Sequence, residues 1–152
     1  MAKNYWMLVS SADNFEATKR HGFEVQGVKS RHRKKAERMQ PGDRVAYYLT
    51  GIQAFGGTAT ITSPYWEDHS PIWESKKAGE DYPFRVKVEP NLVLEAGEYV
   101  PAEPLAARME YTKRWVPEHW HLAFQGNVHS LSEADFDLIE RALKGAAVPA
   151  GR

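Results

Sequence analysis

The chain has 152 residues, of which 42% are apolar and 26% are charged, and these values are typical of one globular domain with a hydrophobic core. It contains no cysteine, which excludes disulfide bonds, thiolate metal ligands and a cysteine nucleophile. It has no apolar run of about 18 residues, so we expect no membrane-spanning helix. We expect a cytoplasmic monomer, with one domain over residues 1–145 and a disordered tail over residues 146–152.

The net charge of zero hides an uneven distribution along the chain. Residues 1–50 contain 10 Lys and Arg against 5 Asp and Glu, whereas residues 51–110 contain 5 against 10. Such polarity favours one basic face on a neutral protein. A protein that coats DNA regardless of sequence is more often basic throughout. We therefore expect modest affinity for a nucleic-acid backbone, with selectivity supplied by a pocket.

The chain begins with a predicted strand and a short helix. Residues 5–10 are apolar enough for a buried strand. Asp13 can cap the helix, Gly22 can end it, and residues 22–27 then form a loop.

A basic helix and a second strand are expected next. Ser30 can cap a helix over residues 31–39, which Pro41 and Gly42 end. Residues 45–49 then form an apolar strand.

The middle of the chain predicts more strands around a long irregular segment. Residues 58–62 and 84–88 have strand character, and residues 91–94 continue the sheet. Gly56 and Gly57 indicate a bulge or a close backbone approach. Residues 63–83 are irregular, and loops of this length in compact domains are often functional.

The C-terminal third ends in the clearest helix. A short helix is expected near residues 105–109 and a further strand over residues 120–124. Ser132 caps the last helix, Asp135 occupies the capping-box position, and Gly145 ends it. Short strands with helices inserted among them predict an α+β fold, a small curved sheet or barrel with peripheral helices.

The densest positive charge lies on Lys29 and the helix that follows it. These side chains can track the backbone of a nucleic acid: Lys29, Arg31, Arg33, Lys34, Lys35 and Arg38. A solvated helix face explains the same run equally well, so both interpretations stay open.

Aromatic residues are abundant, with five Trp and seven Tyr. Most of these rings are expected in the core, but Trp66 and Trp73 lie in the irregular segment, where a ring can stack on a base for about 1–3 kcal/mol. Ser10 and Ser11 end the first strand, where their hydroxyls can read base edges or cap the following helix.

Signals for catalysis and cofactors are weak. His119 and His121 lie two residues apart without further ligands nearby, so no metal is expected. No serine lies in a Gly-x-Ser-x-Gly elbow, and no glycine loop of a nucleotide-binding type occurs. We therefore expect no cofactor.

Several fragments, in their order and spacing, resemble the EVE domain family of the PUA-like superfamily, which also holds the YTH and ASCH domains. The match covers about residues 4–144 and is closest to stand-alone bacterial and archaeal members. The fragments are Tyr5-Trp6 with Ser10-Ser11, Gly27-Val28, Pro41-Gly42-Asp43 with Val45-Ala46-Tyr47-Tyr48, Ser63-Pro64-Tyr65, Pro71-Ile72-Trp73, Tyr82-Pro83-Phe84-Arg85-Val86, Arg114-Trp115, and Phe124 with Gly126.

The resemblance implies a PUA-like β-barrel with a base pocket between the barrel mouth and the basic helix. By position, it assigns these residues to the pocket: Ser10, Ser11 and Asn14 on the edge-reading side, Val28, Lys29 and His32 in the turn over the base, Trp73 as a cage wall, and Tyr47 and Trp115. It assigns the backbone contacts to Lys29, Arg31, Arg33, Lys34 and Lys35. At Lys29 the YTH relatives have a cage tryptophan, so one aromatic wall is missing here.

Two functions are compatible with these residues and this resemblance. The first is a module that binds DNA or RNA and recognises a modified base, a modified cytosine in DNA or a methylated base in RNA, without chemistry of its own. The alternative is an ASCH-like amidohydrolase acting on a modified nucleoside, with Lys29, Ser11 or Ser30, and an acid such as Glu110.

Overall fold

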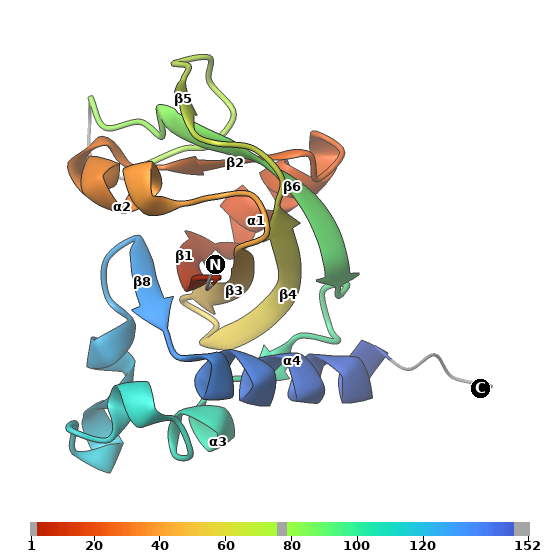
Figure 1. The fold of residues 1–152 in the computed structure, drawn as a ribbon. Coiled ribbons are helices and arrows are strands. Elements are labelled where there is room, and N and C mark those ends of the chain that lie inside the picture. Colours follow the sequence, from red (N-terminus) through yellow and green to blue (C-terminus); the bar gives the residue numbers. More distant parts are fainter. Residues whose placement is uncertain (1–2, 76–78, 148–152) are drawn as a thin grey trace.

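The computed structural model describes residues 3–75 and 79–147. A strongly curled sheet lies at its centre, with strands in the order β2-β6-β4-β3-β1-β8 (Figure 1). Helices cover this sheet from outside, so the predicted α+β class with a small curved sheet is confirmed. No helix of the described residues is both long and apolar enough to span a membrane.

Two parallel strands form the middle of the sheet. Residues 5–11 of β1 (Tyr5–Ser11) lie opposite residues 44–50 of β3 (Arg44–Thr50), and β8 (Val128–Leu131) pairs antiparallel with β1. Because β1 and β3 run in the same direction, Ser11 and Thr50 end at the same edge of the sheet.

The sheet continues with β4 (Ala54–Ile61), which is antiparallel to β3, and then with β6 (Phe84–Val93), which is antiparallel to β4. The pairing of β3 with β4 skips Gly56, and a Cβ atom on Gly57 would lie 2.5 Å from the Leu92 carbonyl oxygen. Both halves of the prediction for this glycine pair, a bulge and a close backbone approach, are therefore confirmed.

Three short strands complete the sheet. The strand β2 (Val25–Val28) pairs with β6, as does β5 (Trp66–Glu67), and β7 (Val100–Pro101) pairs with β4. The region predicted as a loop over residues 22–27 therefore contains most of β2, which is held by its partner β6.

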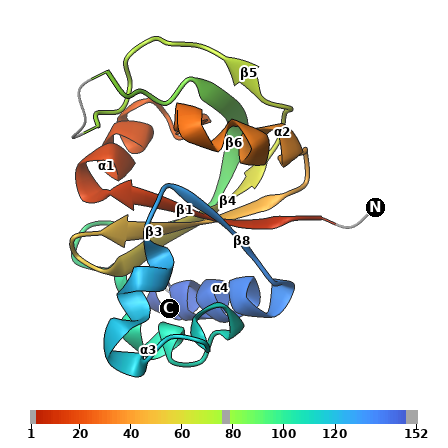
Figure 2. The ribbon, with the colours of Figure 1, turned by 90° about the vertical axis from the view of Figure 1, so that its left-hand side faces the viewer.

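Alternation along the strands separates two hydrophobic cores. Trp6 and Leu8 point into the curl, where they join Phe15 and Tyr47, whereas Met7 points to the other face. That second face packs against α3 (Glu103–Ala106), the 3₁₀ helix η3 (Pro117–Phe124) and α4 (Glu133–Ala147), which lie together below the sheet (Figure 2).

The first helix, α1 (Ala12–Arg20), is capped differently from the prediction. Ser11, and not Asp13, is its N-cap, and the Ser11 Oγ accepts a hydrogen bond from the Asn14 backbone N–H at 3.0 Å. Asp13 instead lies in the first turn, where its negative charge complements the helix dipole.

The basic segment forms two short helices instead of one. A 3₁₀ turn, η1 (Ser30–His32), leads into α2 (Arg33–Arg38), which ends at the predicted Pro-Gly turn. Lys29 is the N-cap of η1 and no side chain caps it, so the expected Ser30 cap is wrong.

Two predictions for the C-terminal third also need correction. The segment predicted as a strand over residues 120–124 belongs to η3, which begins at Pro117. The last helix begins beside Ser132, as predicted, but continues past Gly145 to Ala147. The predicted tail therefore loses residues 146 and 147 to α4, and its remaining residues lie outside the described part of the chain.

Candidate nucleic-acid interface

A cavity of about 400 Å³ opens at the edge where β1 and β3 end. The end of β1, the first turn of α1, the residue after β2, the end of β3 and the segment before β6 all contribute to its wall. The main polar and aromatic lining residues are Ser10, Ser11, Asn14, Lys29, Arg31, Thr50, Glu74, Ser75, Glu80 and Tyr82. The structure thus brings together five of the residues predicted from sequence, Ser10, Ser11, Asn14, Lys29 and Arg31.

Asn14 holds one wall of the cavity in place. Its Nδ2 donates to the Glu74 carbonyl oxygen at 2.8 Å and lies 3.3 Å from the Tyr82 hydroxyl, while its Oδ1 accepts from the Glu74 N–H at 2.9 Å. Both ends of this amide are therefore used to fasten the Glu74 segment to α1. Asn14 acts as a positioning residue for the wall.

Lys29 is anchored at both ends. Its backbone N–H donates to the Asn127 Oδ1 at 2.9 Å, and its Nζ lies 3.3 Å from the Glu80 Oε1 and 5.6 Å from the centre of the Tyr82 ring. Asn127 is itself buried and bound to the backbone of Val9 in β1. The Lys29 ammonium is thus held between a carboxylate and an aromatic face.

Glu80 accepts from a second cation as well. Arg31 donates from its Nη1 to the Glu80 Oε2 at 2.8 Å, and the Ser75 hydroxyl donates to Oε1 at 2.5 Å. The hydrogen bond from Ser75, together with Lys29 and Arg31, lowers the pKa of the Glu80 carboxyl. The carboxylate is therefore ionised at neutral pH, and two of the predicted backbone-binding cations are paired with it.

The other predicted backbone contacts differ in their exposure. Arg33 and Lys34 are exposed, although Arg33 pairs with Glu37 at 3.1 Å. Lys35 is partly buried and donates from its Nζ to the Val128 carbonyl oxygen at 2.8 Å; this burial, with Arg38 nearby, lowers the pKa of its amine. Arg33 and Lys34 are therefore the two of these three cations that face solvent.

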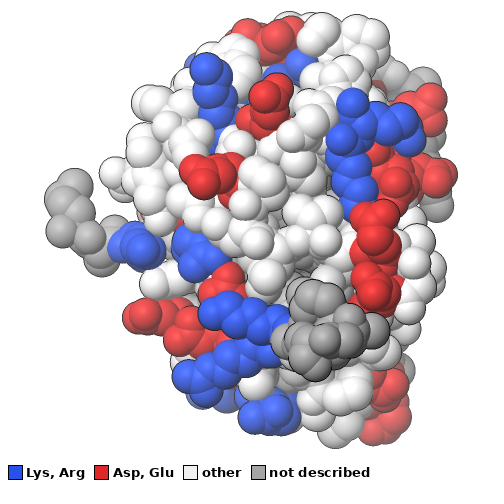
Figure 3. Space-filling model, turned by 90° about the vertical axis from the view of Figure 1, so that its right-hand side faces the viewer, with Lys and Arg blue, Asp and Glu red and all other residues white. Residues whose placement is uncertain are grey.

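The face on the right of Figure 1 has a different character. Lys and Arg lie there beside Asp and Glu around a broad uncharged area (Figure 3). No single sign of charge covers that face. The helix α2, which contains four Lys and Arg, lies on the opposite side of the molecule, on the left in Figure 1.

Trp73 lies behind the cavity wall. Only 8% of its surface is exposed, its Nε1 donates to the Thr18 Oγ1 at 2.9 Å, and its ring meets the Tyr82 ring edge to face at 5.9 Å. A Cβ atom on Gly27 would lie 2.6 Å from the Trp73 ring. Trp73 lines a neighbouring cavity formed by residues within 69–75 and 79–85, and Tyr82 is the aromatic residue that both cavities share among the described lining residues.

Four further residues that were predicted for the pocket do not line this cavity: Val28, His32, Tyr47 and Trp115. Tyr47 is fully buried between Phe15 and Phe23 inside the curl, and Val28 belongs to the same core. His32 is half-buried on η1, where its ring accepts from the Arg31 Nε at 3.3 Å.

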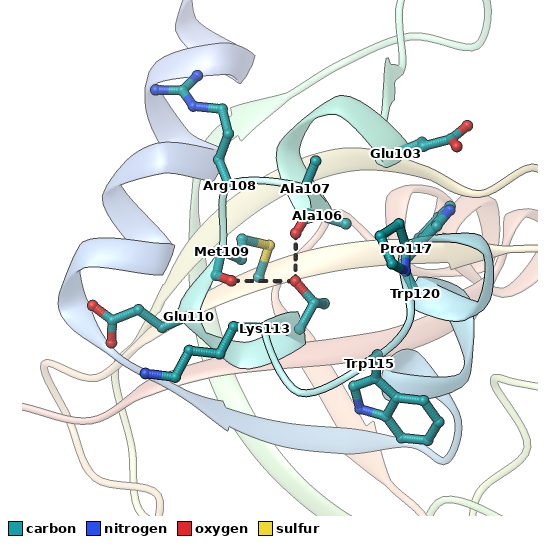
Figure 4. A pocket seen from close by; sticks show the side chains of 11 residues that line it. Glu103, Ala106, Ala107, Arg108, Met109, Glu110, Lys113, Trp115, Pro117 and Trp120 are labelled. Carbon is teal, nitrogen blue, oxygen red and sulfur yellow. Dashed lines mark hydrogen bonds between the residues drawn. The ribbon is translucent and has the colours of Figure 1, made fainter.

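Trp115 lies in the helical half of the molecule. It lines a different cavity of about 530 Å³, with Trp115, Pro117 and Trp120 on one side and Met109 and Glu110 on the other (Figure 4). Glu110, the acid considered for an amidohydrolase, therefore lines the cavity of Trp115 and is absent from the described lining of the Lys29 cavity.

Four residues of the site were not predicted from the sequence: Thr50, Glu80, Tyr82 and Asn127. Thr50 could have been found from the parallel pairing of β1 and β3, which aligns it with Ser11. No local pattern marks Glu80 or Asn127, because their contacts with Lys29 join segments far apart in sequence. Within the described residues, no group of three or more His, Asp or Glu is placed to hold a metal ion.

Comparison with known proteins identifies the family. The model of the EVE domain matches residues 4–142. The chain belongs to the EVE domain family. A UPF0310 protein of Pyrococcus horikoshii is 30% identical over 150 residues, which cover 91% of this chain and 98% of that protein. A UPF0310 protein of Pyrococcus abyssi is 29% identical over 148 residues, with coverages of 92% and 99%.

Solved structures of low sequence identity share the fold of this EVE domain. The Mmi1 YTH domain matches with a TM-score of 0.69 at 8% identity over 97% of this chain and 92% of that one. The YTH domain of the Zygosaccharomyces rouxii MRB1 protein, in complex with N6-methyladenosine RNA, matches with a TM-score of 0.64 at 15% identity, with coverages of 91% and 85%. A hypothetical protein from Leishmania major matches with a TM-score of 0.64 at 18% identity, with coverages of 95% and 96%.

Proposed function

We propose that this EVE domain is a nucleic-acid-binding module that accepts a modified base, a modified cytosine of DNA or a methylated base of RNA, in the 400 Å³ cavity beside α2. The observation that carries the proposal is the meeting of Ser10, Ser11, Asn14 and Lys29 in this one cavity, in a fold that a neighbour uses to bind N6-methyladenosine RNA.

The cavity has the size and lining expected for a flat polar ring. Ligand pockets usually fall between about 300 and 1,000 Å³. The hydroxyls of Ser10 and Ser11 can hydrogen-bond the edge of a base, and the Tyr82 ring offers an aromatic surface. Recognition of a base in such a pocket requires a nucleotide that is unpaired or turned out of its helix.

The cavity and α2 carry different charges, and these favour different parts of a nucleic acid. Three acidic residues, Asp13, Glu74 and Glu80, line the cavity with two basic ones, Lys29 and Arg31. A phosphate is poorly matched to that lining, whereas an uncharged base fits it. The exposed Arg33 and Lys34 are the better partners for phosphates, with Arg31 between the two regions.

The same contacts support binding over catalysis. A lysine acts as a nucleophile or base only after it has lost its proton, which burial or a neighbouring cation promotes. The Lys29 Nζ instead lies 3.3 Å from the Glu80 carboxylate, as one partner of an ion pair. For the amidohydrolase alternative, the lysine is thus already paired with Glu80, and the acid Glu110 lines a different cavity.

A binding titration tests the proposal. The ligands are matched short oligonucleotides, single- and double-stranded, with unmodified cytosine, 5-methylcytosine, 5-hydroxymethylcytosine, adenine or N6-methyladenine at one position and fixed salt. We expect one modified form to bind more tightly than its unmodified match, and Lys29→Gln to reduce that preference.

A matched control is Lys144→Gln, because it removes the same charge from an exposed position on α4. Equal binding of all forms by the wild-type protein contradicts base recognition. Turnover of a modified nucleoside by pure protein, lost in Lys29→Gln, would instead favour the amidohydrolase.

A further inference from the structure

Glu80 occupies an unusual position for an acid on a nucleic-acid-binding surface. Its side chain is only 13% exposed, yet it lines the cavity between the two cations Lys29 and Arg31. A nearby acid weakens the attraction of both cations for phosphate. Its presence therefore needs a reason other than backbone binding.

Stability of the fold is a weak reason. A largely buried ion pair loses much of its Coulomb energy to the desolvation of both charges, so such a pair is poor evidence for stabilisation. The start of η1 is already fastened, because the Lys29 N–H binds the side chain of the buried Asn127. The Glu80 contacts are thus not required to hold the backbone of Lys29 at the cavity.

The three donors to Glu80 fix its orientation and leave capacity for a ligand. An ionised carboxylate can only accept hydrogen bonds, and it offers about four lone-pair positions on its two oxygens. Ser75, Lys29 and Arg31 use three of them in the described structure. The result is a pre-oriented acceptor in the cavity wall, which favours a ligand that presents a hydrogen-bond donor.

Ser11 supplies the complementary group. Its Oγ accepts from the Asn14 N–H, and among residues 3–75 and 79–147 no acceptor receives its proton. The Ser11 hydroxyl can therefore donate to an acceptor on the ligand, while Glu80 receives from a donor. A base edge with an amino group next to a ring nitrogen or carbonyl has both features.

We propose that Glu80 is a specificity-determining residue that accepts a hydrogen bond from the exocyclic amino group of the bound base. The ligand class is therefore an amino-bearing base, as in cytosine, adenine or guanine, and uracil and thymine, which carry no such group, are disfavoured. This inference rests on the proposed function and deepens it, because it names the chemical group that the cavity reads.

The test compares oligonucleotides that differ by one amino group at one unpaired position. The pairs are adenine against unsubstituted purine, cytosine against pyrimidin-2-one, and guanine against hypoxanthine. A specific base contact contributes about 1–3 kcal/mol of discrimination. We therefore expect the Kd ratio of at least one pair to be about tenfold in the wild-type protein.

The decisive variant is Glu80→Met, which keeps the length of the side chain and removes both its charge and its carboxylate acceptors. This change frees Lys29 and Arg31, so binding of every oligonucleotide is expected to tighten by a common factor. The Kd ratio within a pair cancels that factor, and we expect the ratio to fall toward one. Glu98→Met makes the same substitution at an exposed position after β6 and should keep the wild-type ratio.

Three outcomes separate the inference from the function on which it rests. A wild-type ratio near one in all pairs, or an unchanged ratio in Glu80→Met, overturns the role of Glu80 while oligonucleotide binding remains. A wild-type protein that binds none of the oligonucleotides contradicts the proposed function itself. If Glu80→Met does not fold, Glu80→Asp keeps the charge but withdraws the carboxylate, and the same fall in ratio is expected.

Discussion

The two halves of the molecule each contain a cavity with a tryptophan nearby, but the cavities differ in their chemistry. The cavity beside α2 joins hydroxyls, a largely buried ion pair and an aromatic ring from segments that lie far apart in the sequence. The larger cavity in the helical half combines apolar residues such as Met109 and Trp115 with charged ones such as Glu110 and Lys113, and none of its charged side chains forms an ion pair within the described residues (Figure 4). Pre-oriented polar groups, and not volume, therefore distinguish the candidate site.

The comparison can be tested with a matched pair of tryptophans. Trp73 and Trp120 are 8% and 7% exposed, so replacing either with Ala removes a similar buried surface and should cost about 3–5 kcal/mol of unfolding free energy. We expect only Trp73→Ala to weaken oligonucleotide binding as well, because Trp73 supports Tyr82 in the cavity wall.

Chemical denaturation gives the free energies, and binding is measured at a temperature where both variants are folded. Equal loss of binding in both variants would show that stability alone explains the effect. Normal binding by Trp73→Ala would remove the Trp73 side chain from the support of the site.

A smaller effect is expected on the exposed cations. Reversing Arg33 and Lys34 to Glu should weaken binding to any oligonucleotide and make its salt dependence shallower, by about 2 in the slope of log K against log salt if both contact phosphates. The matched control reverses Lys113 and Arg114, which are also adjacent and exposed but lie in the helical half.

Binding isotherms at several salt concentrations measure this slope. An unchanged slope in the α2 variant would exclude both cations from the interface. A comparable change in the control would mean that net charge, and not the position of α2, governs binding.

The local parts of this fold could be predicted from the sequence, because short-range interactions define them. The strands that begin near Tyr5 and Val45 have strong apolar patterns. Ser132 caps α4 by accepting a hydrogen bond from the backbone N–H of Asp135, which is only three residues away in the sequence. The strands β2 and β8 were missed because they are four residues long and depend on pairing with β6 and β1.

One error had a local signal that was misread. Trp120, Ala123 and Phe124 are all buried and have helical spacing, and Pro117 is well suited to begin a helix.

The site was predictable only where it depends on strand ends, as at Ser11. Glu80 could not be placed, because its contacts with Lys29 and Arg31 exist only after the chain has folded.

The smallest predicted effect concerns two histidines that respond to pH in opposite directions. His69 lies between Glu67 and Asp81, and its hydrogen bonds to Asp81 and then Glu67 raise its pKa. His129 lies near Lys35, and burial first, with that charge, lowers its pKa.

Linkage gives the sign of each contribution. Since the folded pKa of His69 is raised, its stabilisation is complete below the unfolded value of about 6.5 and is lost as pH rises through the folded pKa. Since the folded pKa of His129 is lowered, the unfolded state takes up a proton first, and stability falls as pH drops below about 6.5 toward the folded pKa.

Melting temperatures from about pH 5 to pH 9 should separate these contributions. His69→Gln should remove a stabilisation that grows toward acid, and the effect should be small because this histidine is exposed. His129→Gln should make the acid-side loss of stability less steep, although it also removes the hydrogen bond to the Tyr111 hydroxyl at all pH values. The slope against pH, and not the melting temperature at one pH, is therefore the quantity that identifies each histidine, and slopes unchanged in both variants would contradict both assignments.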